Sequence, residues 1–232
     1  MKPTILRDRA TTPDGKPLTL HEHDGGFVIR VDGVELMSTR QHHSEERLAE
    51  EVCRRMTGRG RRLLIGGLGL GFTLRAALGR LGPDDHVVVA ELVPAVVRWN
   101  RTPEYGLAAD ALDDPRVELV VGDVADVMRK SPARFDGVIL DVDNGASGLS
   151  AAANDGLYTS RGLTTARASL RSGGCLAIWS AEPDPACAQR MQAVGFDVVE
   201  ERVRTHAGGG GWIHLFIGVV SPAGRSPRPS RR

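Results

Sequence analysis

A cluster of glycines has the spacing of a nucleotide-binding turn. The cluster follows an apolar run at 63–65, and a helical pattern begins directly after it. A strand, a glycine turn and a helix in this order bring bare backbone close to a nucleotide-like ligand. The sequence therefore predicts cofactor contacts at Gly66, Gly67, Gly69 and Gly71.

Acidic residues follow the next two apolar runs. Glu91 ends the run at 86–91, twenty positions after Gly71. A carboxylate at this place holds a ribose diol in dinucleotide-binding folds. Asp123 follows the run at 117–121, where it also suits the N-cap of a helix starting at Val124. Leu92 and Val124 adjoin these acids and are predicted as further cofactor contacts.

A third polar group lies at the end of the apolar run at 136–141. Asp141 and Asp143 are predicted as catalytic carboxyls, with Asp141 also at the cofactor and Asn144 at the substrate. Ligands sit at this edge of open α/β sheets, and two close carboxyls can share one proton at a raised pKa. The alternative is turn chemistry, since Asp, Asn and Gly are also what a loop at 143–145 would use.

Three aromatic residues are weaker candidates. Tyr158 is predicted as a catalytic residue lining the acceptor pocket, with simple packing as the alternative. His42 and His43 precede a helical pattern and are predicted to contact the substrate, with an exposed pair as the alternative. No His, Cys and Asp cluster has metal-ligand spacing, so no metal is expected.

These residues need a sheet to position them. Apolar runs alternate with helical patterns, and their continuity is typical of strands covered on both faces. Two final runs, at 196–200 and 212–217, have only a glycine-rich loop between them and should pair antiparallel. The fold class predicted is α/β, with a doubly wound, mostly parallel, seven-stranded sheet. Strands are expected at 62–66, 86–91, 117–121, 136–141 and 174–180, and helices at 72–81, 94–101, 124–130, 160–171 and 184–194.

The N-terminal part differs from this pattern. Asp24-Gly25 and Asp32-Gly33 separate short apolar runs between 17 and 38, which predicts a small antiparallel meander. Ser44 is an imperfect N-cap for a helix over 44–57. We expect a β cap at 1–42, a Rossmann-like domain at 43–220 and a disordered tail rich in Pro, Ser and Arg at 221–232.

Composition excludes several function classes. A net charge of +1 gives no field that would attract nucleic acid or a membrane surface. The apolar runs are too short to span a bilayer, and the charged start at 1–10 lacks the core of a signal peptide. The three cysteines are scattered, as expected for neutral thiols in a cytoplasmic protein. The meander could extend a sheet across a homodimer.

The predicted sheet resembles the class I fold of S-adenosylmethionine-dependent transferases. In that fold the glycine loop meets the amino-acid end of the cofactor, and the acid after the second strand holds the ribose. The resemblance implies that Asp123 contacts the adenine.

Within that fold, the chain resembles spermidine synthase-like proteins over about residues 25 to 220. The resemblance is carried by the runs at 64–67, 73–75, 90–93, 122–123, 141–144 and 157–158. Aminopropyltransferases of the family carry G-G-G-D-G-G, whose Asp grips the amine of decarboxylated S-adenosylmethionine, but Leu70 stands at that position here. They also carry D-x-x-D-P, of which Asp141 matches the first acid while Asn144 and Gly145 replace the later residues.

These departures affect the expected cofactor. A carboxylate facing an ammonium group selects a decarboxylated cofactor and a polyamine. Without it, S-adenosylmethionine is the expected cofactor, its carboxylate held by loop N–H groups, and the expected reaction is methyl transfer to a small-molecule amine or hydroxyl. Aminopropyl transfer from decarboxylated S-adenosylmethionine is the alternative.

Two other function classes remain open. An NAD-linked oxidoreductase would need G-x-G-x-x-G, and Phe72 stands where the third glycine belongs. A binding module could contact nucleic acid through the arginines of the tail, but so few charges bind weakly.

Overall fold

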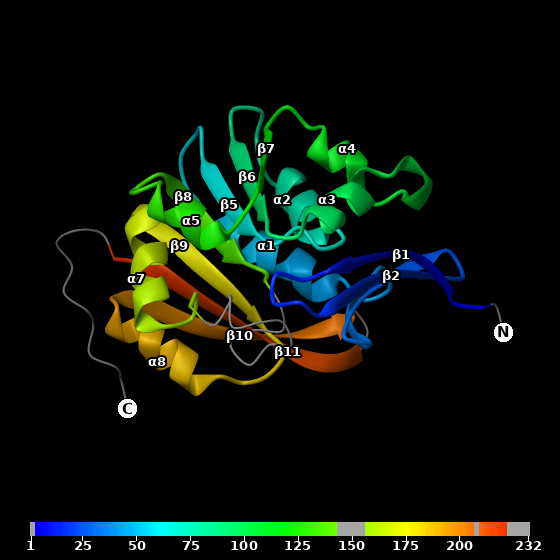
Figure 1. Cartoon of the computed structure of the whole chain (residues 1–232). Helices are drawn as coiled ribbons and strands as arrows, with labels where there is room; N and C mark the ends of the chain where they lie inside the picture. The colour runs from blue at the N-terminus through cyan, green and yellow to red at the C-terminus, as the bar shows by residue number, and fades with distance from the viewer. Residues whose placement is uncertain (1–2, 143–155, 207–208, 222–232) are drawn as a thin grey trace.

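The chain builds two sheets, a large one that carries the helices and a small one at the N-terminus (Figure 1). The structure is a computed structural model that describes residues 3–142, 156–206 and 209–221. The large sheet has seven strands in the order β10-β11-β9-β8-β5-β6-β7. Its strands are β5 (Arg62–Gly66), β6 (His86–Glu91), β7 (Val117–Val121), β8 (Phe135–Leu140), β9 (Leu170–Ser180), β10 (Phe196–His206) and β11 (Gly209–Val220).

Strand direction follows the lengths of the connections. The strands from β5 to β9 pair in parallel, since a helix crosses between each consecutive pair. β11 pairs antiparallel with β9 and β10, as the short glycine-rich connection requires. The predicted fold class is confirmed, including the antiparallel pair at the C-terminal end.

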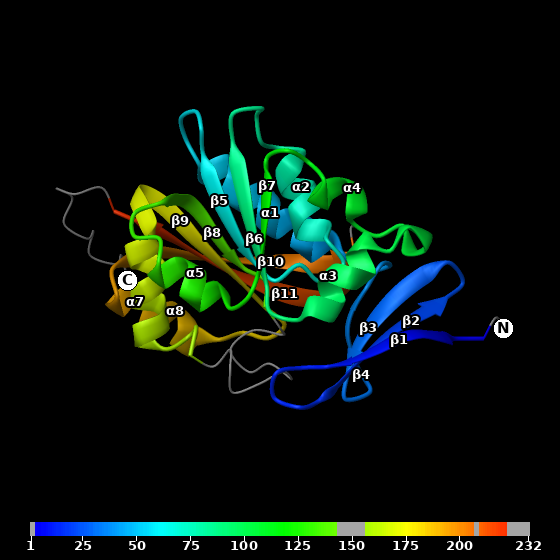
Figure 2. The ribbon, with the colours of Figure 1, turned by 45° about the horizontal axis from the view of Figure 1, so that its top comes forward.

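Helices cover both faces of the large sheet (Figure 2). Leu63 and Ile65 pack against one helix layer while Leu64 between them packs against the other, because successive side chains of a strand alternate. The first layer contains α1 (His43–Arg55), α2 (Phe72–Leu78), α3 (Pro94–Arg101), the 3-10 turn η1 (Pro103–Tyr105) and α4 (Ala109–Leu112). The second contains α5 (Val124–Arg129), α7 (Ser160–Ser169) and α8 (Pro185–Ala193).

The chain reverses its direction of winding beside β5. β6 and β8 flank this strand on opposite sides, so the crossovers leave a crevice at its carboxyl end. The backbone is continuous across this point, since Gly67 N–H donates to the Ala90 carbonyl at 2.8 Å and Asp141 N–H to the Gly66 carbonyl at 3.0 Å. The glycine loop, Glu91 and Asp141 therefore meet at one edge.

The small sheet packs beside this edge. It is antiparallel and runs in the order β1 (Ile5–Thr11), β2 (Pro17–His23), β3 (Gly26–Val31) and β4 (Val34–Ser38). Leu20 and Ile29 bury their side chains in the core shared with α1–α4. On β1, the Asp8 carboxylate accepts hydrogen bonds from Trp99 Nε1 and Arg98 Nη2 of α3, both at 2.7 Å. The N-terminal sheet is thus held by apolar and polar contacts.

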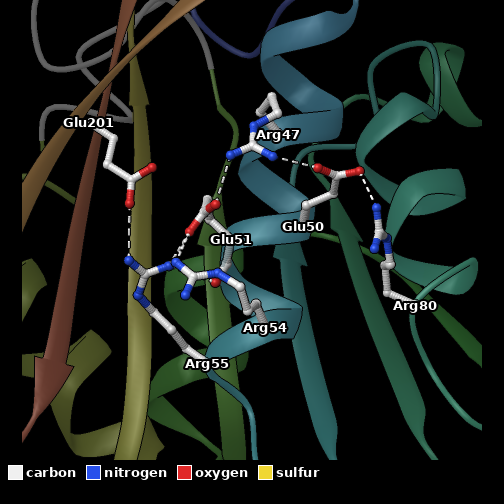
Figure 3. Close-up of polar contacts among 7 residues, drawn as sticks. All are labelled: Arg47, Glu50, Glu51, Arg54, Arg55, Arg80 and Glu201. Atoms are coloured by element: carbon white, nitrogen blue, oxygen red, sulfur yellow. Dashed lines mark hydrogen bonds and ion pairs between the residues drawn. The ribbon is translucent and has the colours of Figure 1, made fainter.

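An ion-pair network fixes α1 between its neighbours (Figure 3). The Glu51 side chain is 6% exposed and accepts from three arginines of its own helix. Arg55 continues to Glu201 on β10, and Glu50 links Arg47 to Arg80 beyond the end of α2. The α1 helix, which precedes the first strand of the main sheet, is therefore tied by ion pairs to β10 and to the segment that follows α2. The network comprises Arg47, Glu50, Glu51, Arg54, Arg55, Arg80 and Glu201.

Some element boundaries differ from the sequence-based expectation. The α1 helix begins at His43, and Ser44 does not cap it, because the Ser44 hydroxyl bonds the Glu45 side chain. β1 was not predicted, and residues 222–232 of the expected disordered tail at 221–232 lie outside the described residues. Within the part of the chain that the structure describes, no helix combines the length and the hydropathy needed to cross a bilayer. All three cysteines are buried, and burial raises the pKa of the Cys53 thiol to about 11.

Candidate functional site

A cavity opens at the carboxyl edge of β5, between the glycine loop and the N-terminal sheet. Most of the residues predicted from the sequence to contact a cofactor line it, and Gly66 and Gly71 support the loop from outside the lining. The predicted contacts found in the wall are Gly67, Gly69, Glu91, Leu92, Asp123, Val124 and Asp141.

The glycine loop passes very close to the end of β8. Gly67 has φ +91°, and a Cβ there would lie 2.3 Å from the Asp141 carbonyl oxygen. Only glycine fits this approach and this backbone conformation. The loop glycine therefore sets how closely Asp141 approaches the cofactor side of the cavity.

Most N–H groups of the loop already have acceptors. Gly67 N–H donates to a β6 carbonyl, and Leu68 N–H donates to the Glu91 carboxylate at 2.8 Å. Leu70 N–H lies 3.2 Å from the Met37 sulfur, and Gly71 N–H donates to the Leu68 carbonyl. Few donors remain to hold an anionic ligand group at this turn.

Glu91 forms one wall of the cavity at the tip of β6. Its side chain is mostly buried, and its two oxygens accept from Leu68 N–H and Val93 N–H, both at 2.8 Å. Two backbone donors fix its orientation at the cavity wall. The position suits a ribose diol, as the sequence predicts.

Asp123 fills one of the two roles that the sequence left open, the N-cap of α5. Its Oδ1 accepts from Ala125 N–H at 2.7 Å, so it caps α5. It also lines the cavity. Its second oxygen is placed to receive a donor from a ligand such as an adenine amine.

Asp141 is a carboxyl of the site whose pKa is strongly raised. Its Oδ2 accepts from the buried Thr73 hydroxyl at 2.6 Å. Burial and the negative charge of Glu45 together raise the pKa of Asp141 to about 7, against the opposing effect of the Thr73 hydrogen bond. A carboxyl that titrates near neutral pH is suited to accept a proton.

The sequence analysis missed two parts of the cavity wall. Glu45, in the first turn of α1, is buried and faces the same cavity. Thr12, Pro13 and Asp14 reach it from the turn between β1 and β2. The site residues were predicted because each follows an apolar run of the main sheet. Neither of these two parts does, and the order of elements along the chain gives no other sign that they face the cavity.

The cavity wall is strongly acidic. Among the described residues that line it are five carboxyl side chains and no lysine, arginine or histidine. A wall of carboxyl side chains is complementary to a positively charged ligand. The acids are Asp14, Glu45, Glu91, Asp123 and Asp141, of which Asp14 pairs with Lys16 Nζ at 3.3 Å.

Other predicted site residues lie apart from the cavity. Tyr158 is buried in the second core, and its hydroxyl donates to the Val142 carbonyl at 3.1 Å, which supports the strand end that carries Asp141. His42 stacks on Phe72 with ring centroids 4.3 Å apart, and neither His42 nor His43 is part of the cavity lining.

The structure does not test the predictions for Asp143 and Asn144 or the expected absence of a metal. Asp143 and Asn144 lie outside the described residues. Within the described ranges, no group of three or more His, Cys, Asp or Glu side chains is arranged to hold a metal ion.

Comparison with known sequences gives one consistent group of relatives, although no family model matches the chain. The polyamine aminopropyltransferase of Pectobacterium carotovorum subsp. carotovorum is 30% identical over 129 residues, covering 55% of this chain and 45% of the relative. That of Pectobacterium atrosepticum is 27% identical over 183 residues, covering 78% and 61%. The chain thus spans about half the length of the curated relatives it matches.

Solved structures agree on the fold. Spermidine synthase from Thermotoga maritima matches with a TM-score of 0.73 at 22% identity, covering 92% of this chain and 72% of that one. A spermidine synthase in complex with the transition state analogue AdoDATO matches with a TM-score of 0.72 at 20% identity, with the same coverage. The chain is thus similar in sequence to polyamine aminopropyltransferases, and it shares the fold of the solved spermidine synthases.

Proposed function

We propose that this chain transfers an aminopropyl group from decarboxylated S-adenosylmethionine to an amine acceptor. The observation that carries the proposal is the cavity wall, with five carboxyl side chains and no basic one among the described residues. Decarboxylated S-adenosylmethionine has a sulfonium and an ammonium charge but no carboxylate, and an amine acceptor adds further positive charge. The names of the sequence relatives support the same reaction.

The residues present fit this cofactor. Glu91 would hold the ribose, and Asp123 would contact the adenine while it caps α5. Asp141 faces the cavity where the glycine loop and the end of β8 meet. These three acids follow three parallel strands, so the sheet holds them in a fixed relation.

The same geometry argues against intact S-adenosylmethionine. Its carboxylate would need a cationic side chain or available N–H groups. The cavity lining has no cationic side chain among the described residues, and four N–H groups of the glycine loop already have acceptors. The cavity lining and the sequence relatives therefore favour aminopropyl transfer, the alternative expectation from the sequence, over methyl transfer, the main one.

The chain's own contribution to the reaction is positioning and proton transfer. A bound sulfonium supplies a carbon already activated toward a nucleophile, so alignment provides most of the rate. Asp141 would accept the proton that the acceptor nitrogen releases as the N–C bond forms and the C–S bond breaks, its electron pair remaining on sulfur. The buried Thr73 hydroxyl holds the carboxylate in place for this step.

One observation favours methyl transfer as a second candidate function. Leu70 stands where the family's loop carries the carboxylate that grips the cofactor amine, and its side chain is buried in the core. If aminopropyl transfer is correct, another acid must face that amine. Asp14 and Glu45 are the additional acids in the cavity wall.

Product analysis tests the proposal. The purified chain is incubated with 1,4-diaminobutane and either decarboxylated or intact S-adenosylmethionine, and the products are identified by mass spectrometry. We expect an aminopropylated diamine and methylthioadenosine from the decarboxylated cofactor. A methylated product from the intact cofactor alone would replace the proposal by methyl transfer.

A further inference from the structure

Glu45 occupies the junction between two cavities. It lines the acidic cavity described above and also a neighbouring one. The neighbouring cavity adds polar and apolar groups from β4, the start of α1 and the β10–β11 hairpin, among them Glu35, Gln41, Thr205 and Ile213. Leu36, Met37 and Trp179 also line both cavities, so Glu45 is the one carboxyl side chain among the described residues that the two linings share.

The burial of Glu45 has no structural explanation of the kind seen elsewhere on the same helix. Glu51 is similarly buried but is surrounded by three arginines. Glu45 is 6% exposed, and its carboxylate accepts a hydrogen bond from the Ser44 hydroxyl at 2.5 Å. Among the described residues, no lysine, arginine or histidine forms an ion pair with it. Burying a carboxylate without a cation is costly, which points to a cation that arrives with the ligand.

Glu45 and Asp141 act on each other across the cavity. The negative charge of Glu45 contributes to the raised pKa of Asp141, and burial raises the pKa of Glu45, with Glu46 adding a smaller repulsion. Each has one hydroxyl donor, from Ser44 and Thr73 respectively. Two carboxyls held in this way attract a cation between them.

We propose that Glu45 is a second acceptor-side carboxyl, which together with Asp141 binds an ammonium group of the amine acceptor where the two cavities meet. The neighbouring cavity then receives the rest of the acceptor's chain. This inference rests on the proposed function and deepens it. It adds a binding residue for the amine acceptor, Glu45 on α1, which follows no strand of the main sheet.

A matched pair of variants on one helix turn tests the inference. Binding of 1,4-diaminobutane is measured by calorimetry, with and without methylthioadenosine, in the unaltered protein, in Glu45→Gln and in Glu46→Gln. Glu46 is the control, since its side chain is 41% exposed, pairs with His42 Nδ1 at 2.9 Å and lies outside both cavity linings. We expect Glu45→Gln to weaken diamine binding about tenfold or more and Glu46→Gln to leave it within about twofold.

The outcomes separate this inference from the proposed function. Equal diamine affinity in Glu45→Gln and Glu46→Gln overturns the inference, as does a protein that binds methylthioadenosine but no diamine. A protein that binds no adenosyl compound contradicts the proposed function, and the diamine titration without nucleoside still decides the role of Glu45.

The pH dependence of diamine binding to the unaltered protein tests the inference even if the Glu45→Gln variant does not fold. Diamine affinity in the unaltered protein should rise about tenfold between pH 6 and pH 8, as Asp141, whose pKa is raised to about 7, loses its proton. In Glu45→Gln the midpoint should move to lower pH, because the repelling charge on Asp141 is gone. A flat profile in the unaltered protein overturns the inference.

Discussion

At the scale of single residues, environment distinguishes carboxyls that look alike in the sequence. Glu51 and Glu45 are both buried on α1, but three arginines surround the first and a single serine hydroxyl contacts the second. Asp141 lies opposite Glu45 and its pKa rises to about 7. The cavity therefore holds acids with different tasks, some fixed by backbone donors and some ready to take up a proton.

The raised pKa of Asp141 predicts a pH-dependent stability. The folded protein keeps the proton of Asp141 up to about pH 7, while the unfolded chain loses it near pH 4, so the free energy of unfolding falls as pH rises between these values. Asp141→Asn removes this contribution and should raise the unfolding free energy at pH 8, by at most about 4 kcal/mol at about 1.4 kcal/mol per pKa unit. Urea denaturation at pH 5 and pH 8 measures it.

The matched control is the exposed Asp126→Asn, which should leave the pH dependence unchanged. If Asp141 titrated at its usual pKa, the difference in unfolding free energy between Asp141→Asn and the unaltered protein would be the same at pH 5 and pH 8. That result would contradict the account of this residue.

The acids that the sequence identified share one property. Glu91, Asp123 and Asp141 each follow an apolar strand, and carboxyl ends of parallel strands meet at one edge. Glu45 could not be found in this way. It stands in a Ser-Glu-Glu-Arg run that has the composition of a solvated helix start, and only the packing of α1 against the sheet makes it buried.

At the scale of elements, the glycine loop depends on space as well as on backbone conformation. Gly67 and Gly33 both have positive φ, at +91° and +81°. A Cβ at Gly67 would meet the Asp141 carbonyl at 2.3 Å, whereas one at Gly33 would meet nothing within 4 Å. The two positions therefore separate a steric requirement from a conformational one.

Alanine at these two glycines provides the corresponding test. Gly33→Ala should cost about 1 kcal/mol of unfolding free energy from backbone strain. Gly67→Ala should cost clearly more, about 3 kcal/mol, and weaken cofactor binding, because the loop must move away from β8. Chemical denaturation measures both, and equal losses would show that the close approach does not matter.

The α1 network makes a second prediction at this scale. Glu51→Gln leaves Arg47, Arg54 and Arg55 close together around a neutral group and should destabilise the fold by about 3 kcal/mol. The more exposed Glu50→Gln should cost about 0.5 kcal/mol. Thermal unfolding of the two variants compares them, and similar Tm values would mean that burial gives Glu51 no special weight.

At the scale of the whole molecule, two sheets together enclose the cavity. The sequence predicted the meander from its Asp-Gly turns, but it did not predict β1, whose run of charged residues shows no apolar alternation. β1 forms because β2 supplies its hydrogen-bond partners and α3 receives Asp8. The turn that follows β1 then brings Thr12 and Asp14 into the cavity wall, a contribution that local sequence cannot reveal.

Loosening this contact between β1 and α3 should therefore affect ligand binding in the cavity, at a distance from the substituted residue. Asp8→Asn weakens the bonds from Trp99 and Arg98 and should reduce both the unfolding free energy, by about 1 kcal/mol, and the affinity for adenosyl ligands. The control is Glu104→Gln, an exposed residue of η1. Calorimetry with methylthioadenosine compares them. Unchanged affinity in Asp8→Asn would mean that the position of the N-terminal sheet does not shape the cavity.

The most direct measurement is a calorimetric comparison of decarboxylated and intact S-adenosylmethionine on the unaltered protein at about pH 7.5. An acidic cavity whose loop donors are occupied should bind the decarboxylated form at least about tenfold more tightly, a difference of about 1.4 kcal/mol. Equal affinities, or tighter binding of the intact form, would contradict the account.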